Sequence, residues 1–161
     1  MIEKIISGGQ TGADLGGLKA AIKLGLKTGG LAPRGFKTEN GPNPDLFSVY
    51  GLGQAPTDDY SYRTAANVRA SHATVVFATK ASSPGTKLTI KTCEASGKPF
   101  IILNPFASDA SVLLTKFLAG VYLRYGRNLI LNVAGNRESK SPGLEHRVDL
   151  ILTITIPHLV R

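Results

Sequence analysis

Short apolar runs alternate along the chain with segments whose apolar residues recur at helical spacing. The runs are rich in β-branched and aliphatic residues and are bounded by Gly, Pro or Asn, which predicts buried strands over 1–6, 74–79, 98–103 and 129–133. Strands that alternate with helices in this way are typical of a parallel sheet, and nearly continuous apolar strands indicate that helices cover both faces. The pattern therefore predicts an α/β domain with a doubly wound, mostly parallel sheet flanked by helices.

Capping residues mark where the predicted helices begin and end. The first helix follows the turn at 7–14 and ends near Gly25, and another runs from the turn at 82–86 to Ser96, before Gly97. Ser141 is expected to cap the last helix, with Pro142 at its first position. Asp58 or Asp59 is expected to begin a helix that ends near Ala70. Ser108 or Asp109 is expected to begin another helix, whose apolar face consists of Val112, Leu113, Phe117 and Leu118.

Two segments have weaker signals. Residues 26–31 are expected to form a second strand, although two consecutive glycines dilute its apolar character. Residues 33–58 hold many Gly and Pro residues and are predicted to be one long irregular loop, which in a compact domain is usually functional or mobile.

The turns that follow the strands are the expected place for a ligand. In an open parallel sheet, ligands bind at the carboxyl ends of the strands, which here are followed by the turns 7–14, 79–86, 104–106 and 134–139. The first turn contains Gly8-Gly9-Gln10-Thr11-Gly12, whose glycines would let backbone N–H groups approach a phosphate at a helix start. A plain strand-to-helix turn is the structural alternative.

The other turns strengthen the prediction of an anion pocket. Ser82-Ser83-Pro84-Gly85-Thr86 again places hydroxyls and a glycine at a helix start, and Arg137 in the last turn has a guanidinium that can bind phosphate through two hydrogen bonds. The first turn has neither the Walker pattern nor GxGxxG, and no acidic residue lies between Asp14 and Glu39 to bind a ribose. A nicotinamide or ATP site is therefore disfavoured.

Charge and composition narrow the ligand class. The chain of 161 residues has 19 Lys and Arg against 11 Asp and Glu, a formal net charge of +8, which attracts nucleic acid, anionic lipid or a phosphorylated small molecule. No run of five basic residues occurs and aromatic residues are few, so nucleic-acid binding is the weaker interpretation. The single Cys93 excludes an internal disulfide, and the three His residues lack metal-ligand spacing.

Neither a signal peptide nor a membrane span is expected. The N-terminal residues lead directly into an apolar strand and a glycine turn, and no stretch of about 20 apolar residues occurs. A cytoplasmic location is therefore expected.

Several segments together resemble the molybdenum-cofactor carrier family, a Rossmann-like branch of the superfamily that includes the lonely-guy cytokinin-activating enzymes. The matching segments follow the family order along nearly the whole chain. They are Ser7-Gly8-Gly9-Gln10-Thr11-Gly12-Ala13-Asp14, Pro33-Arg34-Gly35-Phe36 with Glu39 and Gly41, Tyr60 with Arg63-Thr64 and Asn67-Val68, Gly85-Thr86 with Leu88-Thr89, and Leu131-Asn132-Val133-Ala134-Gly135 with Arg137-Glu138-Ser139.

The resemblance implies a fold, a ligand and partners. It implies one Rossmann-like domain over residues 1–161, assembled as a homo-tetramer or, failing that, a dimer, which binds molybdenum cofactor (molybdopterin) as cargo and passes it to molybdenum-cofactor enzymes. The cofactor is a pterin dithiolene with a terminal phosphate. The resemblance and the predicted anion pocket together imply that no residue is a ligand to a resident metal. They also imply these cofactor-binding residues: Gly8, Gly9, Gln10, Thr11, Gly12, Arg34, Arg63, Asn67, Ser82, Ser83, Gly85, Thr86, Asn104, Gly135, Arg137, Glu138 and Ser139.

Two other functions compete with the carrier. One is an enzyme that acts on a nucleotide or nucleoside phosphate in the same pocket, and the other is a basic protein associated with nucleic acid. The lonely-guy enzymes carry a Pro-Gly-Gly-x-Gly-Thr-x-x-Glu motif, and aligning its Thr with Thr86 puts Thr89 in place of the Glu that assists cleavage. A hydroxyl cannot replace that carboxylate as a base near neutral pH. The alignment therefore implies binding without hydrolysis.

Overall fold

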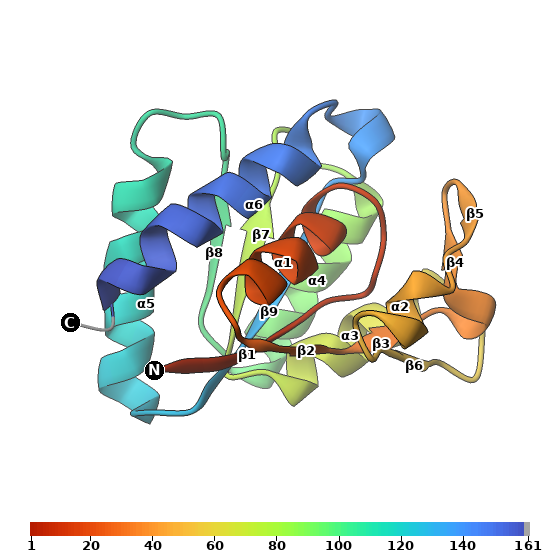
Figure 1. Cartoon of the computed structure of the whole chain (residues 1–161), viewed down its shortest axis with the longest axis horizontal. Coiled ribbons are helices and arrows are strands. Elements are labelled where there is room, and N and C mark those ends of the chain that lie inside the picture. The colour runs from red at the N-terminus through yellow and green to blue at the C-terminus, as the bar shows by residue number, and fades with distance from the viewer. Residues whose placement is uncertain (160–161) are drawn as a thin grey trace.

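The central feature of the structure, a computed structural model that describes residues 1–159, is a five-stranded sheet (Figure 1). Every neighbouring pair of its strands is parallel. The strands, in spatial order, are β2 (Lys27–Gly29), β1 (Ile2–Ile6), β9 (Leu129–Gly135), β7 (Ala73–Phe77) and β8 (Phe100–Leu103). The predicted α/β fold is confirmed. The last two residues of the predicted domain 1–161 lie outside the described part.

Helices cover both faces of the sheet. Figure 1 shows α1 (Ala13–Lys23) and α6 (Leu144–Thr155) packed together on one face, with α5 (Ala110–Tyr125) beside α6. The opposite face is covered by α3 (Tyr60–Ala70) and α4 (Pro84–Ser96). All residues of the inner strand β7 are buried, as expected for a strand between two helical layers. None of the helices within residues 1–159 has the length and apolar character to cross a membrane.

The two faces of the sheet differ in polarity. On the side of α1, α5 and α6, Phe77 and Leu131 belong to a large apolar core. On the side of α3 and α4, Asn132 and Thr74 alternate with those residues along the strands, and the Asn132 side-chain Nδ2 donates to Thr74 Oγ1 at 3.3 Å. Thr89 of α4 is also buried there. The layer next to the predicted site is therefore polar as well as buried.

The segment predicted to be an irregular loop is folded, so that prediction is wrong. Its apolar residues explain why: Leu46 and Leu52 are buried in a second, smaller core with Leu18 and Ala32. The segment projects past the edge of the sheet in Figure 1. Its elements are β3 (Leu31–Ala32) paired with β6 (Gly53–Gln54), the turn η1 (Arg34–Phe36), the hairpin of β4 (Lys37–Thr38) and β5 (Gly41–Pro42), and the one-turn helix α2 (Asp45–Ser48).

Several predicted helix boundaries are confirmed, and the predicted start of the last helix is corrected. Asp59 caps α3 through the Ser61 amide, Ser83 caps α4, and Gly97 ends it. The last helix, however, begins at Leu144 with Gly143 as its N-cap, and the side chain of Glu138, not that of Ser141, accepts the amides of Gly143 at 2.6 Å and Glu145 at 2.9 Å.

The buried face of α5 also differs from the predicted one. Val112 and Leu113 are 54% and 40% exposed, while Leu114, Leu118 and Val121 face the core. These buried residues follow the i, i+4, i+7 spacing of one helical face. Of the predicted face, Leu118 is buried and Phe117 packs against the core, so the prediction is wrong for Val112 and Leu113 only.

Candidate functional site

Three of the predicted turns meet at one edge of the sheet. Strands β1, β9 and β7 are neighbours and parallel, so the turns after them lie side by side. Together with α3 and the start of α4 they enclose the main cleft, a cavity of about 420 Å³. Its lining residues are Gln10, Tyr60, Arg63, Thr64, Ser83, Pro84, Gly85, Thr86, Leu88, Gly135, Asn136, Arg137 and Lys140.

The start of α4 forms one wall of the main cleft. Ser83 Oγ accepts the Thr86 amide at 3.4 Å and donates to Thr86 Oγ1 at 2.8 Å. Pro84 occupies the first turn, and nothing lies within 4 Å of the position that a Cβ of Gly85 would occupy. The open backbone at Gly85 and the positive end of the helix dipole make this wall suitable for an anion.

Asn136 organises the loop that carries this wall, although it is not one of the site residues predicted from the sequence. It is 3% exposed. Its Oδ1 accepts the amides of Thr79 and Lys80 at 3.0 and 3.1 Å, and its Nδ2 donates to the Lys80 carbonyl at 3.1 Å and to Ser83 Oγ at 3.3 Å. One buried amide therefore sets the path of the loop between β7 and α4.

The charged side chains of the main cleft are all basic. Arg63 and Arg137 place their guanidinium carbons 5.4 and 5.7 Å from the centre of the Tyr60 ring, and Lys140 lines the same cleft. Its lining includes no carboxylate, imidazole or thiol, and no three His, Cys, Asp or Glu side chains within residues 1–159 group closely enough to hold a metal ion. This arrangement can bind an anion but offers no acid–base pair.

Gln10 is a buried lining residue of the main cleft whose amide is held in one orientation. Its Oε1 accepts the backbone amides of Thr11 and Glu39, both at 3.0 Å, and the side chain is only 6% exposed. Its Nε2 is buried and has no partner. An unpaired buried donor costs about 1–3 kcal/mol, which a ligand oxygen would offset.

Arg63 and Asp14 form a buried ion pair behind the cleft. Arg63 Nη1 lies 2.9 Å from Asp14 Oδ2, and the two side chains are 13% and 4% exposed. Burial raises the pKa of Asp14, while the Arg63 guanidinium and the backbone N–H of Gln10 oppose that rise. Gly8 leaves room for the pair, because a Cβ at this position would lie 1.6 Å from Arg63 Nη1.

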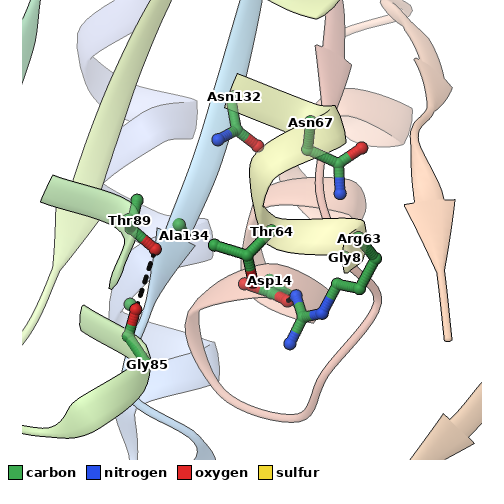
Figure 2. A pocket seen from close by; sticks show the side chains of 10 residues that line it. Gly8, Asp14, Arg63, Thr64, Asn67, Gly85, Thr89, Asn132 and Ala134 are labelled. Atoms are coloured by element: carbon green, nitrogen blue, oxygen red, sulfur yellow. Dashed lines mark hydrogen bonds and ion pairs between the residues drawn. The ribbon is translucent and has the colours of Figure 1, made fainter. Parts of the chain in front are cut away.

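A small polar cavity lies behind the main cleft. This inner cavity, about 50 Å³, shares Arg63, Thr64, Gly85 and Gly135 with the main cleft and is also lined by Asn132 (Figure 2). Figure 2 shows that the hydroxyl of Thr89 points to the Gly85 carbonyl, to which it donates at 3.0 Å. The position aligned with the Glu of the lonely-guy enzymes is therefore buried and its proton is directed to the backbone.

Glu39 links the β4–β5 hairpin to the turns after β1 and β9. Its carboxylate accepts hydrogen bonds from two of the predicted site residues. It accepts hydrogen bonds from the Thr11 hydroxyl and from the amide and hydroxyl of Ser139. Thr11 therefore does not join Ser83, Thr86 and Arg137. It lines a separate hairpin cleft of about 290 Å³, together with Gly9 and Glu138.

The remaining predicted residues have structural contacts or lie outside the main cleft. Asn67 holds β3 through both backbone groups of Leu31, at 2.8 and 3.0 Å. Gly12 packs against the backbone of 136–138, where a Cβ would lie 2.5 Å from the Asn136 carbonyl oxygen. The predicted residues that are exposed and do not line this cleft are Arg34, Ser82 and Asn104.

Replacing Glu39 with glutamine is expected to destabilise the protein in a pH-dependent way. Burial opposes ionisation of Glu39, but hydrogen bonds from Ser139 and Thr11 and the charge of Arg137 outweigh it and lower its pKa. The ionised carboxylate therefore stabilises the folded state above the unfolded-state pKa of about 4.3, and this contribution is lost as the pH falls through the lower folded-state value.

We expect the Glu39→Gln variant to lose about 1.5–3 kcal/mol of unfolding free energy at pH 7, measured by urea denaturation, and much less at pH 3. The exposed Glu94 of α4 provides the control, because Glu94→Gln should change stability little at either pH. An equal loss for Glu39→Gln at both pH values would contradict the role of its charge.

Comparisons with known proteins are consistent with this geometry. The circularly permutated YpsA SLOG family matches residues 5–156. A crystal structure of a protein from Syntrophus aciditrophicus named a "putative molybdenum carrier protein" superposes with a TM-score of 0.86 and 34% sequence identity, covering 96% of this chain and 95% of that one. Among curated proteins, none matches the chain.

Proposed function

The chain belongs to the circularly permutated YpsA SLOG family and to the molybdenum carriers that it resembles in sequence, and from this membership we propose that it binds, protects and delivers molybdenum cofactor without chemical change. The observation that carries the proposal is the main cleft, whose charged lining is basic and whose buried Gln10 Nε2 has no partner. Its volume of about 420 Å³ lies in the usual range for small-molecule sites.

The donors of the cleft fit a pterin that ends in a phosphate. The start of α4, with Ser83 and Thr86, and the side chains of Arg137 and Lys140 would hold the phosphate. Leu88 and the ring of Tyr60 line the same cleft and would supply apolar surface for the pterin. The cofactor is the cargo of this site, so the protein has only to bind and shield it.

The chemistry of the lining supports a carrier over an enzyme. Removal of a base from a ribose phosphate requires a group that stabilises positive charge on the sugar or transfers a proton. No carboxylate, imidazole or thiol lines the main cleft, and the Thr89 hydroxyl donates to the Gly85 carbonyl. These residues can hold a phosphate, but they provide no base near neutral pH.

The enzyme alternative has a direct test. We expect no released base when the protein is incubated with a panel of nucleoside monophosphates and the products are separated by chromatography. Multiple turnover that is lost on Thr86→Val would keep the site and favour the enzyme. Turnover that survives this substitution would contradict both the carrier and the assignment of Thr86 to the site.

Arg137→Ala is expected to weaken cofactor binding about 10- to 150-fold, which corresponds to the roughly 1.5–3 kcal/mol of a charge-assisted hydrogen bond. The measurement is the dissociation constant for cofactor released from a molybdenum enzyme under anaerobic conditions. Arg34→Ala removes the same charge from an exposed position outside the main cleft and should leave the constant unchanged. Unchanged affinity in a folded Arg137→Ala protein would remove this residue from the site.

We also propose that the protein assembles as a homo-tetramer, with a dimer as the alternative, and delivers its cargo to molybdenum-cofactor enzymes. The exposed apolar side chains of α5, which include Val112, Leu113 and the 85% exposed Leu123, provide surface for contacts between copies. A monomeric mass by light scattering at micromolar concentration would contradict the assembly.

A further inference from the structure

Most polar side chains of the main cleft whose hydrogen bonds are settled present donors, not acceptors, to its interior. We propose that the cleft binds its phosphate in the fully deprotonated, doubly negative form and discriminates against the singly protonated form. This inference rests on the proposed function, because it specifies the state of the phosphate in the same site.

Both side-chain carbonyl groups of the lining are already occupied. Gln10 Oε1 accepts the Thr11 and Glu39 amides, and Asn136 Oδ1 accepts the Thr79 and Lys80 amides. Each carbonyl oxygen has two lone pairs, and each receives two backbone N–H groups. Neither oxygen retains a lone pair for a ligand O–H, whereas Gln10 Nε2 remains an unpaired donor that is buried beside the cleft.

The hydroxyls at the start of α4 are directed by the same amide network. Ser83 donates to Thr86 Oγ1 at 2.8 Å, and Asn136 Nδ2 approaches both hydroxyl oxygens, at 3.3 and 3.5 Å. Thr86 Oγ1 therefore has donors on its lone pairs, and its own proton is free to point outward. Thr64 is the exception in this lining, because its hydroxyl donates to the Tyr60 carbonyl at 2.9 Å and its oxygen can only accept from a ligand.

The charged groups complete a receptor for a dianion. Arg63, Arg137 and Lys140 can only donate, and no carboxylate lines the cleft. A phosphate monoester loses its second proton with a pKa near 6, and the protonated form carries one O–H that needs an acceptor. In this cleft that O–H would face donors at every settled side-chain group except the Thr64 oxygen, and the anion would also have lost one of its two charges. Both effects favour the dianion.

The experiment compares two anions across pH. Isothermal titration calorimetry of the whole protein at constant ionic strength, at pH 8 and pH 5, would use methyl phosphate as the monoester and sulfate as a dianion that does not take up a proton in this interval. If only the dianion binds, methyl phosphate should bind about tenfold more weakly at pH 5, since roughly a tenth of it is then doubly charged. Sulfate should bind within about twofold at both pH values.

Sulfate also controls for titration of the protein itself, since a protein group that titrates between pH 5 and 8 would change the binding of both anions. The titratable and charged groups that face the cleft or stand behind it are Tyr60 and Arg63 on α3, Arg137 and Lys140 after β9, Lys37 over the Tyr60 ring, and the carboxylates of Asp14 and Glu39 beside the two arginines.

A substitution tests whether the buried Gln10 Nε2 donates a hydrogen bond to the anion. Gln10→Glu retains an oxygen for the Thr11 and Glu39 amides but replaces the Nε2 donor with an anionic acceptor. We expect methyl phosphate and sulfate to bind at least tenfold more weakly at pH 8. Gln54→Glu adds the same charge on the exposed strand β6, where the side chain accepts the Gly35 amide outside the cleft, and should leave binding unchanged.

The outcomes separate this inference from the proposed function. Weaker binding of methyl phosphate alone at pH 5 supports selection of the dianion. Binding that is equal at both pH values for methyl phosphate, or a parallel loss for both anions, would overturn the selection while leaving an anion site in place. If neither anion binds at either pH, the cleft is no anion site, and the inference and the proposed phosphate contact both fail.

Discussion

A single methyl group at Gly135 is expected to prevent stable folding. Gly135 has a φ of +149°, and a Cβ there would lie 1.8 Å from the Phe77 carbonyl oxygen and 2.7 Å from its carbon. The two residues pair across β9 and β7, so relief of the clash would separate the central strands. We expect Gly135→Ala to lose more than about 4 kcal/mol of unfolding free energy, the range of exceptional substitutions.

The matched control is Gly85→Ala in the same cleft, where nothing lies within 4 Å of the added Cβ and the residue is helical. Alanine is favoured over glycine in helices by up to about 1 kcal/mol, so this variant should be as stable as the original or more so. Urea unfolding curves of both variants give the comparison. A Gly135→Ala protein with near-native stability would show that the junction of β9 and β7 adapts more easily than its contacts indicate.

Loss of Arg63 is expected to have an effect of similar size through charge. Arg63→Met leaves Asp14 buried without its partner, and breaking a buried ion pair in this way typically costs about 3–5 kcal/mol. The deficit should shrink as the pH falls toward about 4, because the unpaired carboxyl, its pKa raised by burial, then takes up a proton in the folded state and loses its charge. Unfolding free energies of the original protein and of Arg63→Met, measured at pH 7 and pH 4, test whether the deficit shrinks at the lower pH.

The double variant Asp14→Asn with Arg63→Met separates charge from packing. The asparagine side chain can still accept the hydrogen bond that the backbone N–H of Gln10 donates to Asp14 Oδ2 at 3.0 Å. If the buried charge causes the loss, the double variant should recover most of the stability that Arg63→Met removes. A double variant that is as unstable as the single one would assign the loss to the packing of the Arg63 side chain over Gly8 instead.

Most of the sheet could be predicted from the sequence, because its strands are short apolar runs between clear turn and cap residues. Asp59, Ser83 and Gly97 stand where the structure places helix caps. The folded segment around Leu46 and Leu52 was missed because its elements are only two to four residues long and its few apolar residues show no period. Its order depends on burial against Leu18, a contact that local pattern does not reveal.

The division of the candidate site into separate clefts could not be predicted from the sequence. Glycines and hydroxyls in three turns indicated one anion pocket, and the structure does bring Ser83, Thr86 and Arg137 to one cleft. Thr11 is instead directed away by Glu39, a residue 28 positions from it in the chain, and Ser139 is held by the same carboxylate from 100 positions away. Such pairings depend on how the hairpin lies on the sheet.

Asn136 was overlooked for a different reason. A single Asn after a strand is usually a turn residue, and only the placement of the loop between β7 and α4 beside it gives its amide five partners. Its signal in the sequence was its position in the turn 134–139 at the carboxyl edge. Buried amides in such turns merit attention as organisers of neighbouring loops.

The most direct test of the carrier function is the identity of the molecule that leaves the protein when it is denatured. The protein and its Arg137→Ala variant would be isolated anaerobically from a host that makes molybdenum cofactor, and the released small molecules analysed by pterin fluorescence and mass spectrometry. We expect a phosphorylated pterin in near-stoichiometric amount from the original protein and much less from the variant. Recovery of a nucleotide in its place, or no pterin from either protein, would contradict the account.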